Sequence, residues 1–200
     1  MQEHQSTQRV TLRDGRTALV RLLRPDDAAA LTRLFEGLSA ITRGYYGPHP
    51  FDRATAERLC AESGDVSRTA RYVAVLDEGQ LEAQIIGYMI LTREIHPDDQ
   101  QRHGGALDLA HCASFAPCLA DEFQSQGIGT QMAQWVLAQG HAMGLSEVIL
   151  MGGVQARNVR AHRMYCRLGF RKVGEFWTHG ALDLLNYSMV LSFQRQGPEG

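Results

Sequence analysis

The residues with the clearest chemical meaning form one short stretch, Gln124-Ser125-Gln126-Gly127-Ile128-Gly129-Thr130. An apolar run precedes it and a segment of good helix formers follows, so the pattern predicts a loop that leads into a helix N-terminus. Its two glycines allow a tight turn and a close approach of the backbone to a ligand. The first N–H groups of the helix lack intrahelical acceptors and carry the positive end of its dipole. The stretch therefore predicts a cradle for a pyrophosphate.

Two common phosphate-binding motifs fit this stretch poorly. A Walker loop needs Lys and then Ser or Thr after its last glycine, whereas Thr130 and Gln131 follow Gly129. A dinucleotide fingerprint needs a third glycine or alanine where Met132 stands, and an acidic residue at the end of the next strand. Glu147 precedes that strand instead. The sequence thus argues against an NTPase and against a Rossmann-type cofactor site.

A third alternative is the coenzyme A loop of the GCN5-related N-acetyltransferases (GNAT), whose pattern Gln/Arg-x-x-Gly-x-Gly/Ala is matched by Gln124, Gly127 and Gly129. Downstream, Asn158 begins a helical segment that carries Tyr165 seven residues later, and Leu-Gly-Phe follows at 168–170. This resembles the second signature of the same family. The resemblance covers roughly residues 109–173, and residues 21–27 resemble the family's first strand and helix start more loosely. The chain looks loosely nearest the bacterial protein-lysine acetyltransferases.

The resemblance implies an acyl-CoA-dependent N-acetyltransferase. Acetyl-CoA would be its co-substrate, with no metal, and a primary amine would attack the thioester directly in a ternary complex. The acceptor stays open between a protein lysine, an N-terminus and a small-molecule amine. The implied cofactor contacts are the backbone amide of Leu119, the loop residues Gln124, Ser125, Gln126, Gly127, Ile128, Gly129 and Thr130, and Asn158 and Tyr165. The rival hypothesis is a catalytically silent acyl-CoA-binding sensor or interaction module.

The resemblance also implies a role for Tyr165 as the group that protonates the leaving thiolate. A phenol has a pKa near 10, so it serves as a general acid only when it is well positioned. By helical spacing alone, a tyrosine at this position is more often a core aromatic, here packed with Ala161, Met164 and Leu168, than a catalyst. Asn158 is read either as an ordinary helix cap or as a cap that also contacts the cofactor.

The general base is less well defined. The position that holds a glutamate in protein-acetylating relatives falls on Ser114, which cannot act alone as a base at neutral pH and would order a water or pack. Asp108 shares strand parity with Ser114 and would relay a proton through water. Glu94 and the region of His96 are weaker alternatives. Gly152 and Gly153 occupy the start of the loop before Asn158, the other place where an acid is expected.

Length and composition are consistent with one catalytic domain. The chain has 200 residues, 44% of them apolar, and a formal charge of −2. We expect a single domain over 1–200, with the acceptor side in 9–62 and the acetyl-CoA-binding core in 106–173. The scattered basic residues argue against nucleic acid, and the lack of a long apolar run or signal peptide argues against a membrane and for the cytoplasm. The four cysteines lack CxxC spacing, which argues against a disulfide framework, and a covalent acyl-enzyme is disfavoured.

Periodicity predicts an α/β (mixed α+β) fold. The expected architecture is a GNAT-like central, mostly antiparallel, splayed mixed sheet of about seven strands flanked by about four helices. Asp14-Gly15 should close an N-terminal hairpin, and Pro117 should force a bulge or an unpaired site in a strand at about 107–120. An edge strand that tolerates proline is the alternative. The expected helices start at Pro25 and span 52–62, 127–143 and the residues after Asn158; the other expected strands are 71–76, 83–94, 147–151 and 184–193.

Two further expectations concern partners. The segment 38–51 should select the acceptor, together with the late strands, and Tyr45, Tyr46, Phe51 and Trp177 would form an aromatic wall around an amine or simply pin the loop to the core. The strand at 184–193 is expected to be exposed and could pair across a homodimer. A polar loop is expected at 96–105.

Overall fold

The computed structural model describes residues 7–77 and 83–193, which form two compact units. Unit 1 comprises residues 7–91 and 116–136, and unit 2 comprises residues 92–115 and 137–193. Strand β5 (Cys112–Leu119) and helix α5 (Ile128–Ala142) contribute residues to both units. The described residues contain nine strands and six α-helices, more than the sequence predicts, and the mixed α/β class with a mostly antiparallel open sheet is confirmed.

Unit 1 is built on antiparallel strands. Strand β1 (Thr7–Thr11) pairs with β2 (Thr17–Leu22), which pairs with β3 (Thr69–Leu76), and β4 (Gln84–Thr92) and the end of β5 follow in hydrogen-bonding order. The hairpin between β1 and β2 is confirmed, and Gly15 in its turn has a φ of 86°. The turn expected at 77–79 lies largely outside the described residues.

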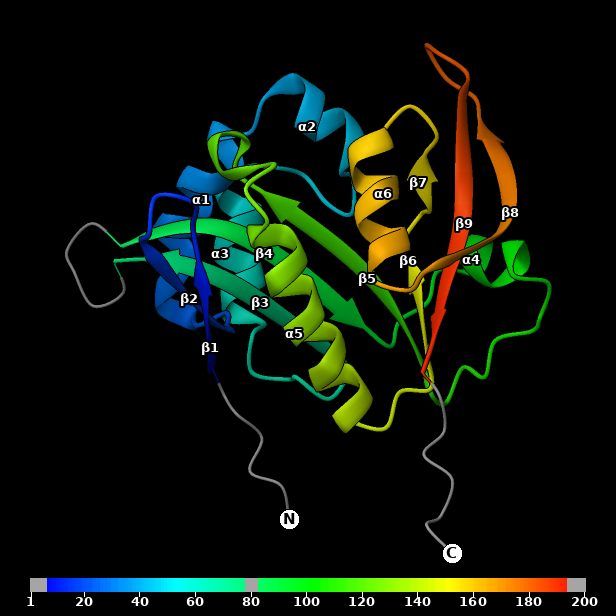
Figure 1. Ribbon diagram of the computed structural model, residues 1–200, viewed down its shortest axis with the longest axis horizontal. Helices are drawn as coiled ribbons and strands as arrows, with labels where there is room; N and C mark the ends of the chain where they lie inside the picture. The colour runs from blue at the N-terminus through cyan, green and yellow to red at the C-terminus, as the bar shows by residue number, and fades with distance from the viewer. Residues whose placement is uncertain (1–6, 78–82, 194–200) are drawn as a thin grey trace, which may run out of the picture. The chain divides into compact units, whose positions relative to one another are not determined.

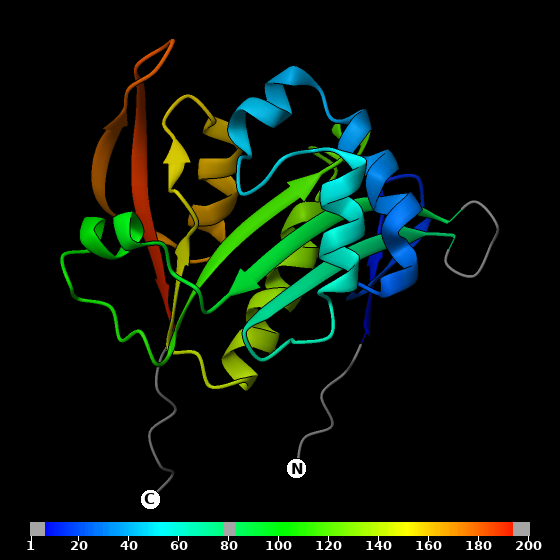
Figure 2. The same cartoon turned by 180° about the vertical axis from the view of Figure 1, so that it is seen from behind.

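Helices cover both faces of these strands. The short 3-10 helix η1 (Pro25–Asp27) leads into α1 (Ala28–Gly37), and α2 (Ala40–Tyr45) and α3 (Arg53–Ala61) follow. The carboxylate of Asp52 caps α3 by accepting the Thr55 N–H at 2.7 Å. Helices α1 and α3 lie on one face of β3 and β4, and the first half of α5 lies on the other (Figures 1 and 2).

Unit 2 contains the parallel pair of the sheet. The first half of β5 runs parallel to β6 (Glu147–Leu150), in a ladder from Cys112 opposite Glu147 to Phe115 opposite Leu150. Strand β9 (Leu184–Ser192) pairs antiparallel with β6, with the short β7 (Val154–Gln155) and with β8 (Arg171–Thr178). Because β9 has partners along both edges, the prediction of an exposed late strand that pairs across a dimer is wrong.

Two segments that the sequence predicts as loops contain helices. The expected polar loop at 96–105 holds α4 (Pro97–Arg102), which starts with a proline at its first position and two aspartates in its first turn. The acceptor-side segment 38–51 holds α2, capped by the Ser39 hydroxyl, which accepts the Thr42 N–H at 3.2 Å. The last helix, α6 (Val159–Arg167), lies where the sequence places it. No helix in the described ranges is both long and apolar enough to cross a bilayer.

Candidate functional site

The loop between β5 and α5 has the backbone shape of an anion cradle. The 3-10 helix η2 (Asp121–Phe123) precedes it, and two loop residues have positive φ angles, Ser125 at 61° and Gly127 at 86°. A left-handed residue among right-handed neighbours turns successive N–H groups toward one side, which makes a concave anion-binding surface. The Gln131 N–H is bonded to the Gly127 carbonyl at 3.1 Å, which starts the intrahelical ladder of α5. The N–H groups before it point forward from the helix end.

Polar side chains fix this loop to the rest of unit 1. Gln124 donates from its side-chain nitrogen to the Leu119 carbonyl at 3.0 Å and to the Thr42 hydroxyl at 3.1 Å. The Asp121 carboxylate accepts the Ser39 N–H at 2.9 Å and the hydroxyls of Ser39 and Thr42, each at 2.7 Å. Both side-chain N–H donors of Gln124 bond within the protein. The glutamine of the motif therefore supports the loop. The anchors also join the cradle to α2.

The last residues of β5 lie beyond its ladder with β6, which ends at Phe115, and we call the side of these residues that faces away from β4 the open edge. The Ala120 N–H donates to the Ile86 carbonyl of β4 at 2.9 Å, and a Cβ at Gly87 would lie 2.8 Å from the side chain of Leu119. Leu119 is therefore opposite Gly87 in an antiparallel pairing. Hydrogen bonds alternate between the two edges of a strand, so the N–H of Leu119 points away from β4. This is the orientation that a thioester-binding amide requires.

Pro117 lies on the same edge. The Phe115 carbonyl accepts the Met151 N–H at 3.0 Å, and Phe115 is the last β5 residue in the ladder with β6. Two residues later, Pro117 faces the same side beyond the end of that ladder, so its missing N–H costs no hydrogen bond between strands. The prediction of an unpaired site is confirmed. The edge-strand alternative holds for this half of the strand, because β5 lies between β4 and β6 only as far as Phe115.

The two candidates for the base in unit 2 differ in environment. Ser114 is 1% exposed, lies opposite Ile149 in the β5–β6 ladder, and its hydroxyl has no hydrogen-bond partner among the described residues. Asp108 lies in a turn before β5, where its carboxylate accepts from the Ala110 N–H and contacts His111 Nδ1 at 2.9 Å. The predicted strand start at 107 and the shared strand parity are therefore wrong. A relay from Asp108 to Ser114 loses its geometric basis.

Helix α6 carries the second family signature. The Asn158 side chain caps it by accepting the Ala161 N–H at 3.2 Å, which confirms the cap. Tyr165 is 7% exposed, and its ring packs edge-on against Phe170 at 5.6 Å between centroids. The structure thus supports the packing role of Tyr165, and its role as a proton donor stays a prediction.

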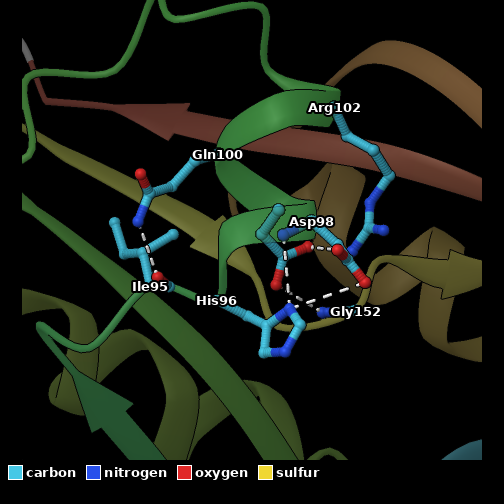
Figure 3. A network of polar contacts seen from close by, with 7 residues as sticks. Ile95, His96, Asp98, Gln100, Arg102 and Gly152 are labelled. Atoms are coloured by element: carbon cyan, nitrogen blue, oxygen red, sulfur yellow. Dashed lines mark hydrogen bonds and ion pairs between the residues drawn. The ribbon is translucent and has the colours of Figure 1, made fainter.

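An acidic side chain does reach the turn after β6, from a part of the chain that the sequence did not single out. Asp99 of α4 is 2% exposed, and its carboxylate accepts the Gly152 N–H at 3.1 Å and an Arg102 N–H at 2.6 Å. The guanidinium of Arg102 also lies over the Phe176 ring at 4.2 Å. Figure 3 shows α4 held in this network, with Gln100 bonded to the Ile95 carbonyl at 2.8 Å. Two donors hold the Asp99 carboxylate, so it positions the turn.

The thiols are mostly unsuited to a covalent mechanism. Burial raises the pKa of Cys60 to about 11 and the pKa values of Cys112 and Cys118 to about 12. Such thiols are protonated and poor nucleophiles at neutral pH. Cys166 is exposed and lies 3.8 Å from His162 Nε2 on the same helix, a pairing that the sequence analysis missed. A spacing of four residues on a helix was the available signal. In the described ranges, no cluster of three or more metal-ligating side chains occurs.

The expected aromatic wall is only partly assembled. Tyr46 and Phe51 lie 5.9 Å apart between ring centroids and belong to one cluster in unit 1, whereas Trp177 on β8 is 56% exposed in unit 2. The guanidinium of Arg43 lies 5.6 Å from the Phe51 ring centroid. The cluster contains a residue that the sequence analysis did not weigh, His49, which packs between these rings.

Comparison with known proteins gives a consistent result. A family model described as "Acetyltransferase (GNAT) domain" matches residues 17–171. Among solved structures, the GNAT domain of a PAT from S. lividans aligns with a TM-score of 0.69 at 19% identity, over 96% of this chain and 100% of that one. A ribosomal-protein-S5-alanine acetyltransferase from Vibrio fischeri aligns with a TM-score of 0.70 at 17% identity, over 90% and 96%. The acetyl-CoA-bound yncA from Salmonella typhimurium, described as a putative acetyltransferase, aligns with a TM-score of 0.66 at 13% identity, over 92% and 98%. No curated protein sequence matches this chain.

Proposed function

Because the chain belongs to the GNAT family of acetyltransferases and uses acetyl-CoA as its co-substrate, we propose that it acetylates a primary amine by direct attack within a ternary complex. The acceptor is a protein lysine, an N-terminus or a small-molecule amine. The observation that carries this proposal is the open edge of β5, where the Leu119 N–H points away from β4 just before the loop of Ser125 and Gly127. Such an edge suits an extended pantetheine arm that leads to a pyrophosphate.

In the proposed reaction, the loop 124–130 holds the pyrophosphate through backbone N–H groups and the dipole of α5. The Leu119 N–H donates to the thioester carbonyl oxygen and stabilises the negative charge that develops there. The nitrogen of the neutral amine bonds to the carbonyl carbon and the carbon–sulfur bond breaks. Tyr165 gives its proton to the departing thiolate and regains one from the acylated nitrogen. Geometry matters more than acidity for this last step, because the free phenol is a weaker acid than the thiol.

Calorimetry followed by a thiol-release assay tests the proposal. Purified protein is titrated with acetyl-CoA, coenzyme A and dephospho-coenzyme A, and thiol release is then measured with a polyamine, a lysine peptide and a peptide with a free N-terminus. Binding with amine-dependent release supports the proposal and begins to identify the acceptor. Binding without release from any amine would favour a silent acyl-CoA sensor instead.

A single backbone change tests the role of the open edge. Leu119→Pro removes the proposed N–H donor. The extended strand should tolerate this proline as it tolerates Pro117, because β6 makes no ladder bond to β5 beyond Phe115. We expect kcat to fall by about 10²- to 10³-fold, the usual cost of one lost oxyanion donor. Leu119→Ala is the matched control, because it keeps the N–H and removes the side chain that meets Gly87. Equal losses in the two variants would contradict the assigned role of the amide.

A further inference from the structure

The aromatic cluster of unit 1 encloses a histidine. His49 lies in the connection between α2 and α3, and its ring centroid is 5.0 Å from that of Phe35, 5.9 Å from that of Phe51 and 5.8 Å from that of Tyr88. Tyr46 completes the group at 6.0 Å. The rings come from α1, from the α2–α3 segment and from β4, so the chain surrounds one imidazole from several sides.

The hydrogen bonding of His49 fixes which nitrogen carries the proton. Its Nδ1 lies 2.8 Å from the Pro50 carbonyl oxygen, which only accepts, so Nδ1 is protonated. In the neutral ring, Nε2 then presents a lone pair. That nitrogen is shielded from solvent and has no hydrogen-bond partner in the described part of the chain. A buried polar atom without a partner is unfavourable unless a ligand or water satisfies it.

The surroundings of His49 favour its neutral form. Burial is the main cause that lowers its pKa, and the positive charges of Arg58 and Arg71 lower it further. The Pro50 hydrogen bond and the Asp52 carboxylate oppose this shift. Tyr46 and Tyr88 are the titratable side chains that face it across the ring contacts, and burial raises the pKa of Tyr88, so that phenol is neutral. His49 is therefore uncharged at pH 7.

The cluster adjoins the part of β5 that carries the proposed thioester contact. With Leu119 opposite Gly87, the antiparallel pairing places Cys118 opposite Tyr88. The side chains of Tyr88 and Cys118 lie on the face covered by α1 and α3, whereas Gly87 faces Met132 of α5. His49 thus packs against Tyr88, which pairs with Cys118, the residue before Leu119. This contact lies on the face of the sheet opposite α5.

We infer that His49 is the general base that removes a proton from the acceptor amine, in place of the carboxylate that Ser114 replaces. This inference rests on the proposed function. One proton passes from the ammonium group of the acceptor to Nε2 through one water, because Nε2 is enclosed, and the neutral amine then attacks the thioester. As the carbon–sulfur bond breaks, Tyr165 gives its proton to sulfur and takes up the second proton from nitrogen, so that the phenol is restored. The products are the N-acetyl amine, coenzyme A and an imidazolium, which later loses its proton to solvent.

The kinetic test compares His49→Gln with His103→Gln. Glutamine keeps the polarity and cannot take up the proton, and His103 is a matched control because burial also lowers its pKa while it lies at the end of α4, outside the proposed machinery. With the best amine of the panel, we expect kcat/KM at pH 7 to fall by about 10²- to 10⁴-fold in His49→Gln only. The loss should shrink about tenfold per pH unit up to the pKa of the amine, because the free amine then needs no base. Acetyl-CoA affinity, measured by calorimetry, should stay within about twofold and shows that the variant is folded.

Nitrogen-15 NMR of the histidine rings tests the inference without turnover. The wild-type spectrum should show His49 as the neutral Nδ1–H tautomer at pH 7, and addition of butylamine to the coenzyme A complex should shift its Nε2 resonance. A His49 that is protonated or carries its proton on Nε2 at pH 7 overturns the inference, as does a His49→Gln variant with wild-type kcat/KM and pH profile. If wild-type protein releases no thiol while the NMR result holds, the proposed function fails and the base assignment fails with it. If it releases thiol and His49→Gln does too, only the base assignment fails.

Discussion

Substitution of Gly127 by alanine separates the backbone cost of the cradle from its use in binding. Gly127 has a φ of 86°, and a Cβ placed there would meet only the side-chain nitrogen of Gln131 at 3.9 Å. The space is therefore sufficient, and the penalty is the left-handed backbone itself, about 1–2 kcal/mol for a residue with a Cβ. Alanine either keeps the left-handed conformation and lowers the free energy of unfolding, or relaxes the loop and must restore it when acetyl-CoA binds.

The loss of stability and the loss of affinity have the same origin, the left-handed backbone at residue 127. We therefore predict the sum of the two losses and not the share of each. The loss in unfolding free energy of the free protein plus the loss in binding free energy should total about 1–2 kcal/mol. If the loop relaxes completely, the Kd for acetyl-CoA rises about 5- to 30-fold and the unfolding midpoint stays unchanged. If it does not relax, Tm falls by about 2–8 °C and Kd is unchanged. Chemical denaturation and calorimetry on the same preparation measure both terms.

Gly144 provides the matched control, because it has the same φ of 86°, no atom within 4 Å of the position that a Cβ would take, and a place at the opposite end of α5. Gly144→Ala should lower stability by a similar amount and leave acetyl-CoA affinity unchanged. The reasoning is refuted if Gly127→Ala changes neither stability nor affinity. It is also refuted if Gly144→Ala weakens acetyl-CoA binding as much as Gly127→Ala does. The loss of affinity would then arise from a change in α5 as a whole and not from the cradle.

Three other changes test separate parts of the structure. Asp27→Ala removes the carboxylate that pairs with Arg21 in a site where both side chains are over 90% buried, so urea denaturation should show a loss of about 3–5 kcal/mol. A loss under about 1 kcal/mol would mean that the pair is not desolvated. Gly87→Ala places a Cβ 2.8 Å from the side chain of Leu119, so overpacking should lower the free energy of unfolding by about 1–3 kcal/mol. We also expect a lower kcat, and an unchanged kcat would show that this packing does not affect catalysis. Tyr165→Phe should retain acetyl-CoA binding while thiol release falls about 10²-fold or more; unchanged turnover would show that the assigned acid role is wrong.

The cofactor side of the protein was largely predictable because it depends on local backbone. The sequence shows a turn glycine and a helix cap through residues that are close together along the chain. Gly127 adopts a φ of 86°, and Asn158 caps the helix that begins one residue later. Pro117 was predictable for the same reason, since the missing N–H is a property of that residue alone. Only the direction of the open edge required the pairing of β5 with β4 and β6.

The errors have two sources, contacts between distant residues and a local turn that replaces the start of a strand. Asp99 and Gly152 are 53 positions apart, and nothing in the sequence near either residue indicates that a buried carboxylate of one meets the N–H of the other. The strand was predicted to start at 107 because apolar residues continue into that region, whereas the Asp108 carbonyl accepts the His111 N–H at 2.9 Å and forms a turn before the strand. A local hydrogen bond of this kind competes with strand pairing, and aspartate favours it.

The same difference explains why the acceptor side remains a matter of proposal. A pyrophosphate is a fixed chemical group, and any chain that binds it through backbone N–H groups needs glycine-like conformations at set positions. An acceptor amine is recognised by side chains that converge from separate segments, as Phe35, His49 and Tyr88 do here. The spacing of these residues in the sequence depends on where each helix, loop and strand falls along the chain, so it forms no recognisable motif. For a family with a common cofactor and varied acceptors, the acceptor site should therefore be sought near buried polar atoms that the fold leaves without partners. Among the described residues, Nε2 of His49 is such an atom, and its chemistry suits the proposed reaction.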